Sequence, residues 1–331
     1  MSEIFTDDSV KSLPRVVGPY VILELIEKSG ISHVYRARKR ELSSHDSGGE
    51  IALKRLQHKF RNRRFCLQQF RHAARVGTLL HHPNWVRVLG SRQLAGNDWI
   101  EMEYVNGITL SKLFNWALAN KIRFPNELAC FIVLEILTGL QYLHEQKDPN
   151  TGEELGTVHC DISLSNILIS TKGEVKILDL GVAHSKWLES SEYSKLLIGK
   201  PGYFSPEQLT GKDVTNRSDL FSCGVIFYEL LTQCRLFPVK SHLEMVDRVR
   251  DCVVTLPSAV AGDIHPALDK VVMRFLGKRP AHRYGSAAEA IEQLGAILDA
   301  TGQVRAGSED LRQWFRAHML ESQEKRVVDE E

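Results

Sequence analysis

The first third of the chain carries the alternation of apolar and polar residues that is typical of β-strands. Residues 20–37 alternate on either side of Ser29-Gly30, which predicts a hairpin. Apolar residues then recur at roughly helical intervals over residues 64–80, which predicts one helix. Further strands are expected at residues 51–56, 85–89 and 99–104. The front of the chain is therefore expected to be a sheet with a single helix.

Beyond Gly107 the pattern becomes helical. The expected helices cover residues 110–119, 126–146, 214–233, 243–253, 267–276 and 286–300. A strand-rich front and a helix-rich back indicate an α+β protein of two lobes that meet near Asn106-Gly107. No internal repeat or low-complexity tract interrupts this order.

A last helix is expected before a charged tail at residues 324–331. Leu311, Trp314, Phe315 and Met319 fall on one helical face. This face packs on the second lobe or docks a partner protein, and packing on the lobe is the favoured interpretation.

Composition and charge exclude several classes of protein. About a quarter of the 331 residues are charged, as in ordinary globular proteins, and the formal net charge of +1 gives no global attraction to nucleic acid or to a membrane surface. Residues 1–10 contain three acids and no apolar core resembling a signal peptide. The most apolar stretch, residues 128–143, is broken by Glu135 and Gln141 and is expected to be too short to cross a bilayer.

The six cysteines are scattered without a CxxC pair, and several lie in apolar runs. This distribution favours buried thiols in a reducing compartment over a disulfide or zinc framework. We therefore expect a soluble, cytoplasmic protein.

The most informative motif joins Asp161 and Asn166, in the run His159-Cys160-Asp161-Ile162-Ser163-Leu164-Ser165-Asn166, to the later Asp179-Leu180-Gly181. One carboxylate can accept the proton of an attacking hydroxyl, while an amide oxygen and a second carboxylate can hold a metal on nucleotide phosphates. The order and spacing resemble the catalytic loop and metal-binding segment of the eukaryotic-type protein kinases.

Other segments extend the resemblance in the order that the family shows. Ile51-Ala52-Leu53-Lys54 resembles the strand that carries the ATP-binding lysine, and Met102-Glu103-Tyr104-Val105 resembles the hinge. Residues 199–207 resemble the end of an activation segment, residues 218–224 the helix that anchors the catalytic loop, and Arg283 stands where an arginine pairs with Glu207. The tripeptide Asp161-Ile162-Ser163 looks most like the corresponding segment of bacterial serine/threonine kinases.

The resemblance implies a two-lobed kinase fold that uses ATP and Mg²⁺ and acts on a protein substrate. It implies an extension at residues 1–19, lobes at 20–105 and 106–300, and a C-terminal helix and tail at 301–331. Asp161 would be the base, Asn166 and Asp179 the metal ligands, and Lys54 the phosphate ligand. The remaining nucleotide contacts would come from Gly30, Val34, Ala52, Glu103, Val105 and Leu168.

Several positions that help to bind ATP in the family carry other residues in this chain. Glu27, Ser29 and Ser32 occupy the three glycine positions of the nucleotide-covering loop, and we expect a weakened grip. The helix position that carries glutamate in active kinases holds Ala73, and residues 51–97 contain no Asp or Glu. Lys54 is therefore expected to pair with Asp179 or with phosphate alone.

Two neighbours of Ala73 add to this expectation. Gln69, one helical turn earlier, could give Lys54 a neutral hydrogen bond, which is weaker than a charge-assisted one. Gly77, one turn later, stands where kinases place a bulky apolar residue, so a gap or a looser helix is expected there.

Two changes near the catalytic loop compensate one another in our hypothesis. Ser163 replaces the loop lysine of serine/threonine kinases, while Lys200 replaces the threonine that contacts it, so Lys200 is expected to supply the lost charge and to be catalytic. Cys160 stands where an arginine usually binds a phosphorylated activation loop. We therefore expect little dependence on phosphorylation of Ser190, Ser191, Tyr193 or Ser194.

Three functions remain open. An ATP-dependent serine/threonine kinase leads, a pseudokinase that binds nucleotide or partners is second, and a small-molecule phosphotransferase is third. A basic run that includes Arg55, Lys59, Arg61, Arg63, Arg64 and Arg71 is a solvated face or, in the sharper interpretation, a docking surface for an acidic regulatory partner.

Overall fold

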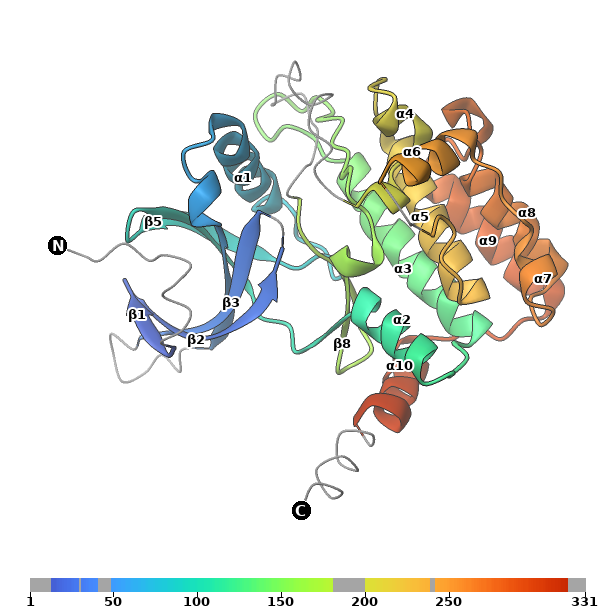
Figure 1. Cartoon of the computed structure of the whole chain (residues 1–331), viewed down its shortest axis with the longest axis horizontal. Coiled ribbons are helices and arrows are strands. Elements are labelled where there is room, and N and C mark those ends of the chain that lie inside the picture. The colour runs from blue at the N-terminus through green and yellow to red at the C-terminus, as the bar shows by residue number, and fades with distance from the viewer. Residues whose placement is uncertain (1–12, 30, 41–48, 181–199, 239–241, 321–331) are drawn as a thin grey trace. The chain divides into compact units, whose positions relative to one another are not determined.

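The computed structural model describes residues 13–29, 31–40, 49–180, 200–238 and 242–320 (Figure 1). The chain forms two compact units. The strand-rich unit lies within residues 1–82, 86–105 and 179–181, and the helical unit comprises residues from 83–85, 106–178 and 182–331. Gly30, the charged tail, and the residues Ser190, Ser191, Tyr193 and Ser194, whose phosphorylation is expected to matter little, fall outside the described residues.

The strand-rich unit is built on one antiparallel sheet with strand order β1-β2-β3-β4-β6-β5. Its strands are β1 (Arg15–Val17), β2 (Tyr20–Lys28), β3 (Ser32–Lys39), β4 (Glu50–Leu56), β5 (Val88–Leu94) and β6 (Asn97–Glu103). The hairpin predicted from the alternation of apolar and polar residues is confirmed, because β2 pairs antiparallel with β3.

The two faces of this sheet bury different clusters. Ile100 lies opposite Lys54 in the β4–β6 pair, so the two share a face, and helix α1 (Arg64–Gly77) packs there. The cluster on the α1 side consists of Leu56, Cys66, Phe70, Ala74 and Ile100. A second cluster includes Tyr20, Ile22, Tyr35, Leu53 and Trp99. The α1 face is the one that presents Lys54.

The expectation of a gap at Gly77 is wrong. A Cβ atom on Gly77 would lie only 2.5 Å from Cγ2 of Val88, so the helix packs closely against β5. The small residue permits close approach of helix and strand rather than leaving a cavity.

The strand expected at residues 85–89 begins later, at Val88. Trp85 belongs to the helical unit, where it forms a parallel bridge with Ile177 and its indole donates to the Gly139 carbonyl at 2.8 Å. The strand-like pattern of residues 85–89 did not reveal this change of unit, because Trp85 is buried in the helical unit whereas Val88 belongs to the sheet.

The helical unit is centred on α3 (Asn126–His144), which packs against α5 (Asn216–Thr232) and α9 (Ala287–Thr301) (Figure 1). The other helices are α2 (Leu110–Ala119), α4 (Pro206–Leu209), α6 (His242–Asp251), α7 (Pro257–Val260) and α8 (Pro266–Phe275). A small sheet orders β7 (Gly107–Thr109), β8 (Ile167–Ser170) and β9 (Val175–Ile177). Short 3₁₀ helices cover His58–Phe60, Leu164–Asn166, Pro201–Tyr203 and Pro280–His282.

Among the described residues, only α3 is long and apolar enough to span a bilayer. Its 19 residues overturn the expectation that this stretch is too short. Ten of them are buried inside the helical unit, where α3 packs on α5 and α9, so burial identifies it as a core helix.

The C-terminal segment forms α10 (Ser308–Phe315) and a π-helical turn at Arg316–Leu320. Leu311 and Phe315 are buried, and the Trp314 ring meets Phe124 edge-on at 4.8 Å between centroids. Trp116 of α2 meets His318 in a T-shaped contact. The favoured interpretation is confirmed, because the apolar side of this helix packs on the helical unit.

Candidate active site

Lys54 and Asp179 form an ion pair within the strand-rich unit. The Lys54 side chain is 7% exposed, and its Nζ contacts Oδ1 of Asp179. Asp179 follows β9 and has a φ of 62°, a left-handed conformation that aspartate tolerates better than most residues. The lysine thus has the carboxylate partner that the sequence indicated, in the absence of one on α1.

Helix α1 presents no acidic group on its buried side. Ala73, at the position of the family glutamate, is buried. Gln69 is 3% exposed, and within the described part of the chain its Oε1 accepts no hydrogen bond. The expected neutral bond from Gln69 to Lys54 is therefore not formed in this conformation.

Two of the residues expected around adenine, Val34 and Ala52, share the Lys54 face of the sheet. Val34 lies opposite Lys54 in the β3–β4 pair, and Ala52 lies opposite Met102 in the β4–β6 pair. At the end of β6, the amide of Glu103 donates to the Arg87 carbonyl at 2.9 Å, and Glu103 Oε1 accepts from the Arg87 amide at 3.1 Å. Val105 follows, half-buried.

In the helical unit, the catalytic loop holds Asp161 in a defined orientation. The Asn166 amide nitrogen donates to Oδ2 of Asp161 at 2.8 Å and to its carbonyl at 2.7 Å. The backbone amide of Lys200 lies 3.4 Å from Oδ1 of Asp161, and Lys200 Nζ lies 3.4 Å from the Ser163 hydroxyl. Leu168 is half-buried on β8. The loop therefore brings together the carboxylate, the amide and the replacement lysine.

A buried aspartate on α5 anchors this loop. Asp219 accepts the backbone amides of His159 at 2.8 Å and Cys160 at 2.9 Å. Its Oδ2 also lies 2.8 Å from Nε2 of His144. Cys160 has a φ of 66°, so the loop turns sharply where Asp219 holds it. The sequence indicated Asp219, whereas His144 was missed because it ends an otherwise apolar helix.

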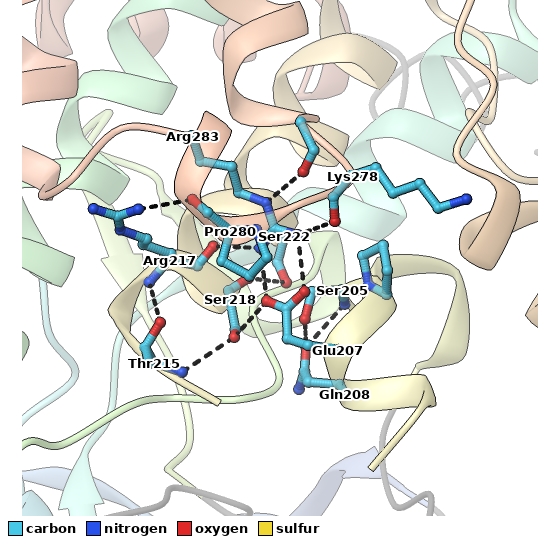
Figure 2. Close-up of polar contacts among 12 residues, drawn as sticks. Ser205, Glu207, Gln208, Thr215, Arg217, Ser218, Ser222, Lys278, Pro280 and Arg283 are labelled. Atoms are coloured by element: carbon cyan, nitrogen blue, oxygen red, sulfur yellow. Dashed lines mark hydrogen bonds and ion pairs between the residues drawn. The ribbon is translucent and has the colours of Figure 1, made fainter. Parts of the chain in front are cut away.

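The end of the activation segment is fixed by a buried ion pair between Glu207 and Arg283 (Figure 2). Two Arg283 nitrogens donate to the two carboxylate oxygens at 2.6 and 2.8 Å, and Ser218 donates to Oε1 at 2.8 Å. Burial alone raises the pKa of Glu207, but the hydrogen bonds and charge of Arg283, aided by Ser218, outweigh it and lower the pKa. The bidentate geometry keeps this carboxyl ionised.

Two further groups of interacting residues could not be predicted from the sequence. Tyr203 donates to Glu229 at 2.7 Å, and Arg235 donates to both side chains, which ties the activation segment to α5. Burial raises the pKa of Glu229, although Arg235 and Tyr203 act in the opposite direction.

The second group is Gln57, whose side-chain amide donates to the Ser29 carbonyl in the β2–β3 turn. A neutral Gln after a strand carries no sequence signal of such a role.

The described residues contain no group of three or more His, Cys, Asp or Glu side chains placed to hold a metal ion. A nucleotide-bound Mg²⁺ needs fewer protein ligands, because phosphates and water complete its octahedron. Since the Asn166 amide nitrogen is directed at Asp161, its oxygen is the atom that can ligate a metal. Asp179 offers a carboxylate, so both donor types fit Mg²⁺.

All six cysteines are free thiols, as expected. Four are buried, and burial raises the pKa of Cys130 to about 12. Cys252 is half-buried and Cys234 is exposed, while burial shields the other four thiols from reagents in solvent.

A strand-rich unit with a buried lysine on its sheet and a helical unit with an Asp-Asn catalytic loop define the class of two-lobed phosphotransferases. The protein kinase domain family matches residues 20–294 of this chain. The chain belongs to the protein kinase domain family.

The chain resembles several bacterial kinases. It is 28% identical over 307 residues to the tyrosine-protein kinase MasK of Myxococcus xanthus, and 28% identical over 288 residues to the serine/threonine-protein kinase PrkC of Bacillus subtilis. These alignments cover 92% and 86% of this chain but only 47% and 41% of the relatives, so the chain spans less than half of each.

A solved structure gives the same fold. The kinase domain of PknI from Mycobacterium tuberculosis matches with a TM-score of 0.64 and 22% identity, over 86% of this chain and 98% of that domain. The expected fold, a strand-rich N-lobe and a helical C-lobe, is confirmed.

Proposed function

We propose that this chain is an ATP-dependent protein kinase that transfers the γ-phosphoryl group to a serine or threonine hydroxyl of a protein. The observation that carries the proposal is the orientation of Asp161 by Asn166 in a loop anchored by buried Asp219. Bacterial serine/threonine kinases such as PrkC are among the relatives, which supports the choice of hydroxyl, and phosphoamino-acid analysis distinguishes serine and threonine from tyrosine.

The chemistry assigned to the catalytic loop is acceptance of a proton. Asp161 receives the proton of the substrate hydroxyl. At the same time the hydroxyl oxygen bonds to the γ-phosphorus, and the bond between the γ-phosphorus and the oxygen that bridges it to the β-phosphate breaks. Asn166 holds Oδ2 of this carboxylate and the Lys200 amide lies near Oδ1, so the carboxylate is already oriented before a substrate binds. Lys200 is proposed to add positive charge beside this loop, where transition-state charge is stabilised most effectively.

The nucleotide is proposed to bind through the residues inferred from the sequence. Lys54 orients the phosphates, while Val34, Ala52, Glu103, Val105 and Leu168 contact the adenosine, together with Gly30 beyond the described residues. Asn166 and Asp179 are the proposed ligands of Mg²⁺, which neutralises charge on the phosphates. Lys54 holds the Asp179 carboxylate in place before metal binds.

Transfer of radiolabelled phosphate from ATP to a generic protein tests this proposal. Asp161→Asn removes the proton acceptor but keeps the shape of the side chain, so we expect a loss of about 100- to 10,000-fold in kcat. Asp179→Asn is expected to abolish Mg²⁺-dependent transfer, and it should also lower the thermal midpoint without nucleotide because buried Lys54 loses its counter-charge.

A pseudokinase gives a different result in the same assay. If the parent chain transfers no phosphate while ATP raises its thermal midpoint, the enzyme assignment is wrong and a nucleotide-binding module is the better description. If ATP neither transfers nor binds, both assignments fail.

Arg55, which the sequence placed in the basic run, is fully buried and does not belong to an exposed surface. A regulatory partner is proposed to dock on the basic surface, defined by the exposed residues Lys59, Arg63, Arg64, Arg71 and Arg75 of the strand-rich unit. Beside it, a small pocket of about 150 Å³ is lined by residues that include Arg61, Asn62 and Leu67. Residues 51–97 contain no acidic residue, and Asp98 at the border of the surface pairs only with Arg71 among its five members in the described contacts. The net positive charge suits the surface to an acidic segment of another protein. If this surface binds its partner through charge, the affinity should fall as the salt concentration is raised.

We also propose a cytoplasmic location for this domain. The supporting observation is the set of six free thiols, which persist in a reducing compartment. Cell fractionation that recovered the domain outside the cytoplasm would contradict it.

A further inference from the structure

The turn between β2 and β3 is closed by its own serine side chains. Ser29 and Ser32 occupy two of the three positions where the family has glycine, and their hydroxyl oxygens lie 2.9 Å apart. The Ser29 hydroxyl also accepts the Ser32 amide at 3.0 Å, and the Ser29 amide donates to the Ser32 carbonyl at 2.9 Å. The two residues therefore hold the ends of the turn together.

Gln57 fastens this turn to the strand that carries Lys54. It follows β4 directly and is 6% exposed. Its side-chain amide donates to the Ser29 carbonyl at 2.6 Å, and its backbone amide donates to the Ile31 carbonyl at 2.8 Å. One residue thus bonds to two carbonyls of the turn, three positions after the ATP-binding lysine.

We propose that Gln57 is a positioning residue for the phosphates of ATP, which replaces the conformational freedom of a glycine loop by a pre-formed turn. A glycine-rich loop must lose conformational entropy when it closes on phosphate. A turn already held by Gln57 loses less, and this offsets the poorer approach that the serine side chains allow. The inference rests on the proposed binding of ATP at Lys54.

The proposal separates phosphate recognition from adenosine recognition. The Gln57 side chain acts on the turn alone, whereas Ala52, Met102 and Glu103 hold their positions through the β4–β6 ladder. Loss of the side-chain amide should therefore weaken the binding of ATP but not of adenosine, which lacks phosphates.

Two substitutions remove the donor while keeping the length of the side chain. Gln57→Met leaves the Ser29 carbonyl without its partner, and Gln57→Glu adds charge repulsion against that carbonyl. Gln68→Met is the matched control, because Gln68 is exposed on α1. Each variant is measured by calorimetric binding of ATP and of adenosine, by kinetics at varied ATP concentration, and by the thermal midpoint without nucleotide.

Gln57→Met is expected to raise the KM for ATP about three- to tenfold, the effect of one lost hydrogen bond, with kcat at saturating ATP within about twofold of the parent. Gln57→Glu should be worse, and adenosine affinity and the Gln68→Met control should be unchanged. Equal losses of ATP and adenosine affinity would indicate a merely structural role and overturn the proposal. Unchanged ATP affinity in both Gln57 variants would also overturn it, whereas a parent chain that binds no ATP would instead defeat the proposed function.

Discussion

At the scale of single residues, the position of one carboxylate determines which group pairs with the buried lysine of the site. Lys54 is buried on a sheet whose covering helix offers Ala73 and Gln69 rather than an acid, and it pairs with Asp179. In this arrangement α1 contributes no charge to the position of the lysine. Control of activity through movement of α1 would therefore lack the ion pair that links this helix to ATP in the wider family.

Substitution of Lys200 tests whether this residue supplies the positive charge that is lost where Ser163 replaces the usual loop lysine. Its Nζ lies 3.4 Å from the Ser163 hydroxyl, the side chain that replaces the usual lysine. Lys200→Met removes the charge and is expected to lower kcat by about 10- to 100-fold, because a positive group near the transferred phosphoryl is lost. Lys200→Arg should retain most of the activity.

The exchange variant Ser163→Lys with Lys200→Thr restores the arrangement of the wider family. It should recover much of the activity that Lys200→Met loses, as measured by radiolabelled transfer at saturating ATP. Unchanged kcat in Lys200→Met would show that the charge has no role, while Asp161→Asn serves as the inactive reference.

Much of the site could be predicted from the sequence because its residues are chemically distinctive. Asp161, Asn166 and Asp179 stand in a spacing that few other functions need, and the absence of acids in residues 51–97 left Asp179 as the partner of Lys54. Gln57 could not be predicted, because its role depends on which carbonyl its neutral side chain meets across the sheet.

At the scale of secondary-structure elements, a buried ion pair joins α4, α5 and the segment before α9. Arg283 is fully buried and donates to Glu207, to the Arg217 carbonyl and to the Gly277 carbonyl. Every donor of such a buried cation needs a partner, since an unpaired buried charge is strongly destabilising. Figure 2 shows the contacts of Glu207 with Ser218 and Arg283.

This junction predicts a specific dependence of stability on pH. The pKa of Glu207 in the folded protein is lowered from its ordinary value of 4.5. Between the two pKa values the unfolded chain binds more protons, so stability is fully present above about pH 4.5 and is lost as the pH falls through the folded pKa. Glu207→Gln should lower the free energy of unfolding at neutral pH by about 3 to 5 kcal/mol, because Arg283 stays buried without its counter-charge.

Urea denaturation at pH 7 and pH 4 measures this effect. The difference between the parent and Glu207→Gln should shrink at the lower pH, because below about pH 4.5 the unfolded parent chain takes up a proton that folded Glu207 does not. Glu309→Gln, which breaks an exposed pair with Arg312, is the control and should change little at either pH. A Glu207 effect independent of pH would show that the carboxyl is not the titrating group.

Periodicity located most helices and strands but misjudged two contacts between elements. The run from Trp85 was assigned to one strand, although Trp85 packs on α3 and β5 begins at Val88. Gly77 was expected to leave space, although Val88 fills it. Both depend on packing between segments distant in sequence, which periodicity along one segment does not report.

At the scale of the whole molecule, charge is balanced overall and uneven locally. The formal net charge is +1, yet residues 51–97 contain no acid. Of the two candidate docking segments, α10 uses Leu311 and Phe315 within its own unit, so its apolar side is already covered. The basic surface is therefore the better candidate for contact with another protein.

Charge reversal on this surface separates local from global electrostatics. The triple variant Lys59→Glu, Arg63→Glu and Arg64→Glu should abolish binding of a fluorescent polyglutamate peptide, because the positive potential at the site is inverted. The exposed lysines Lys121, Lys212 and Lys270 of the helical unit supply a control with the same change in formal net charge when they are reversed to Glu.

If the basic surface is the docking site, the control triple variant keeps most of the parent affinity measured by fluorescence anisotropy. Parent affinity should also fall steeply when salt is raised from about 0.05 to 0.5 M, since the Debye length shrinks from beyond 10 Å to below 5 Å. Equal losses in both triple variants would mean that the peptide responds only to net charge, and affinity insensitive to salt would mean that apolar contact dominates. Either result would remove the basic surface as the site where an acidic partner reaches the kinase.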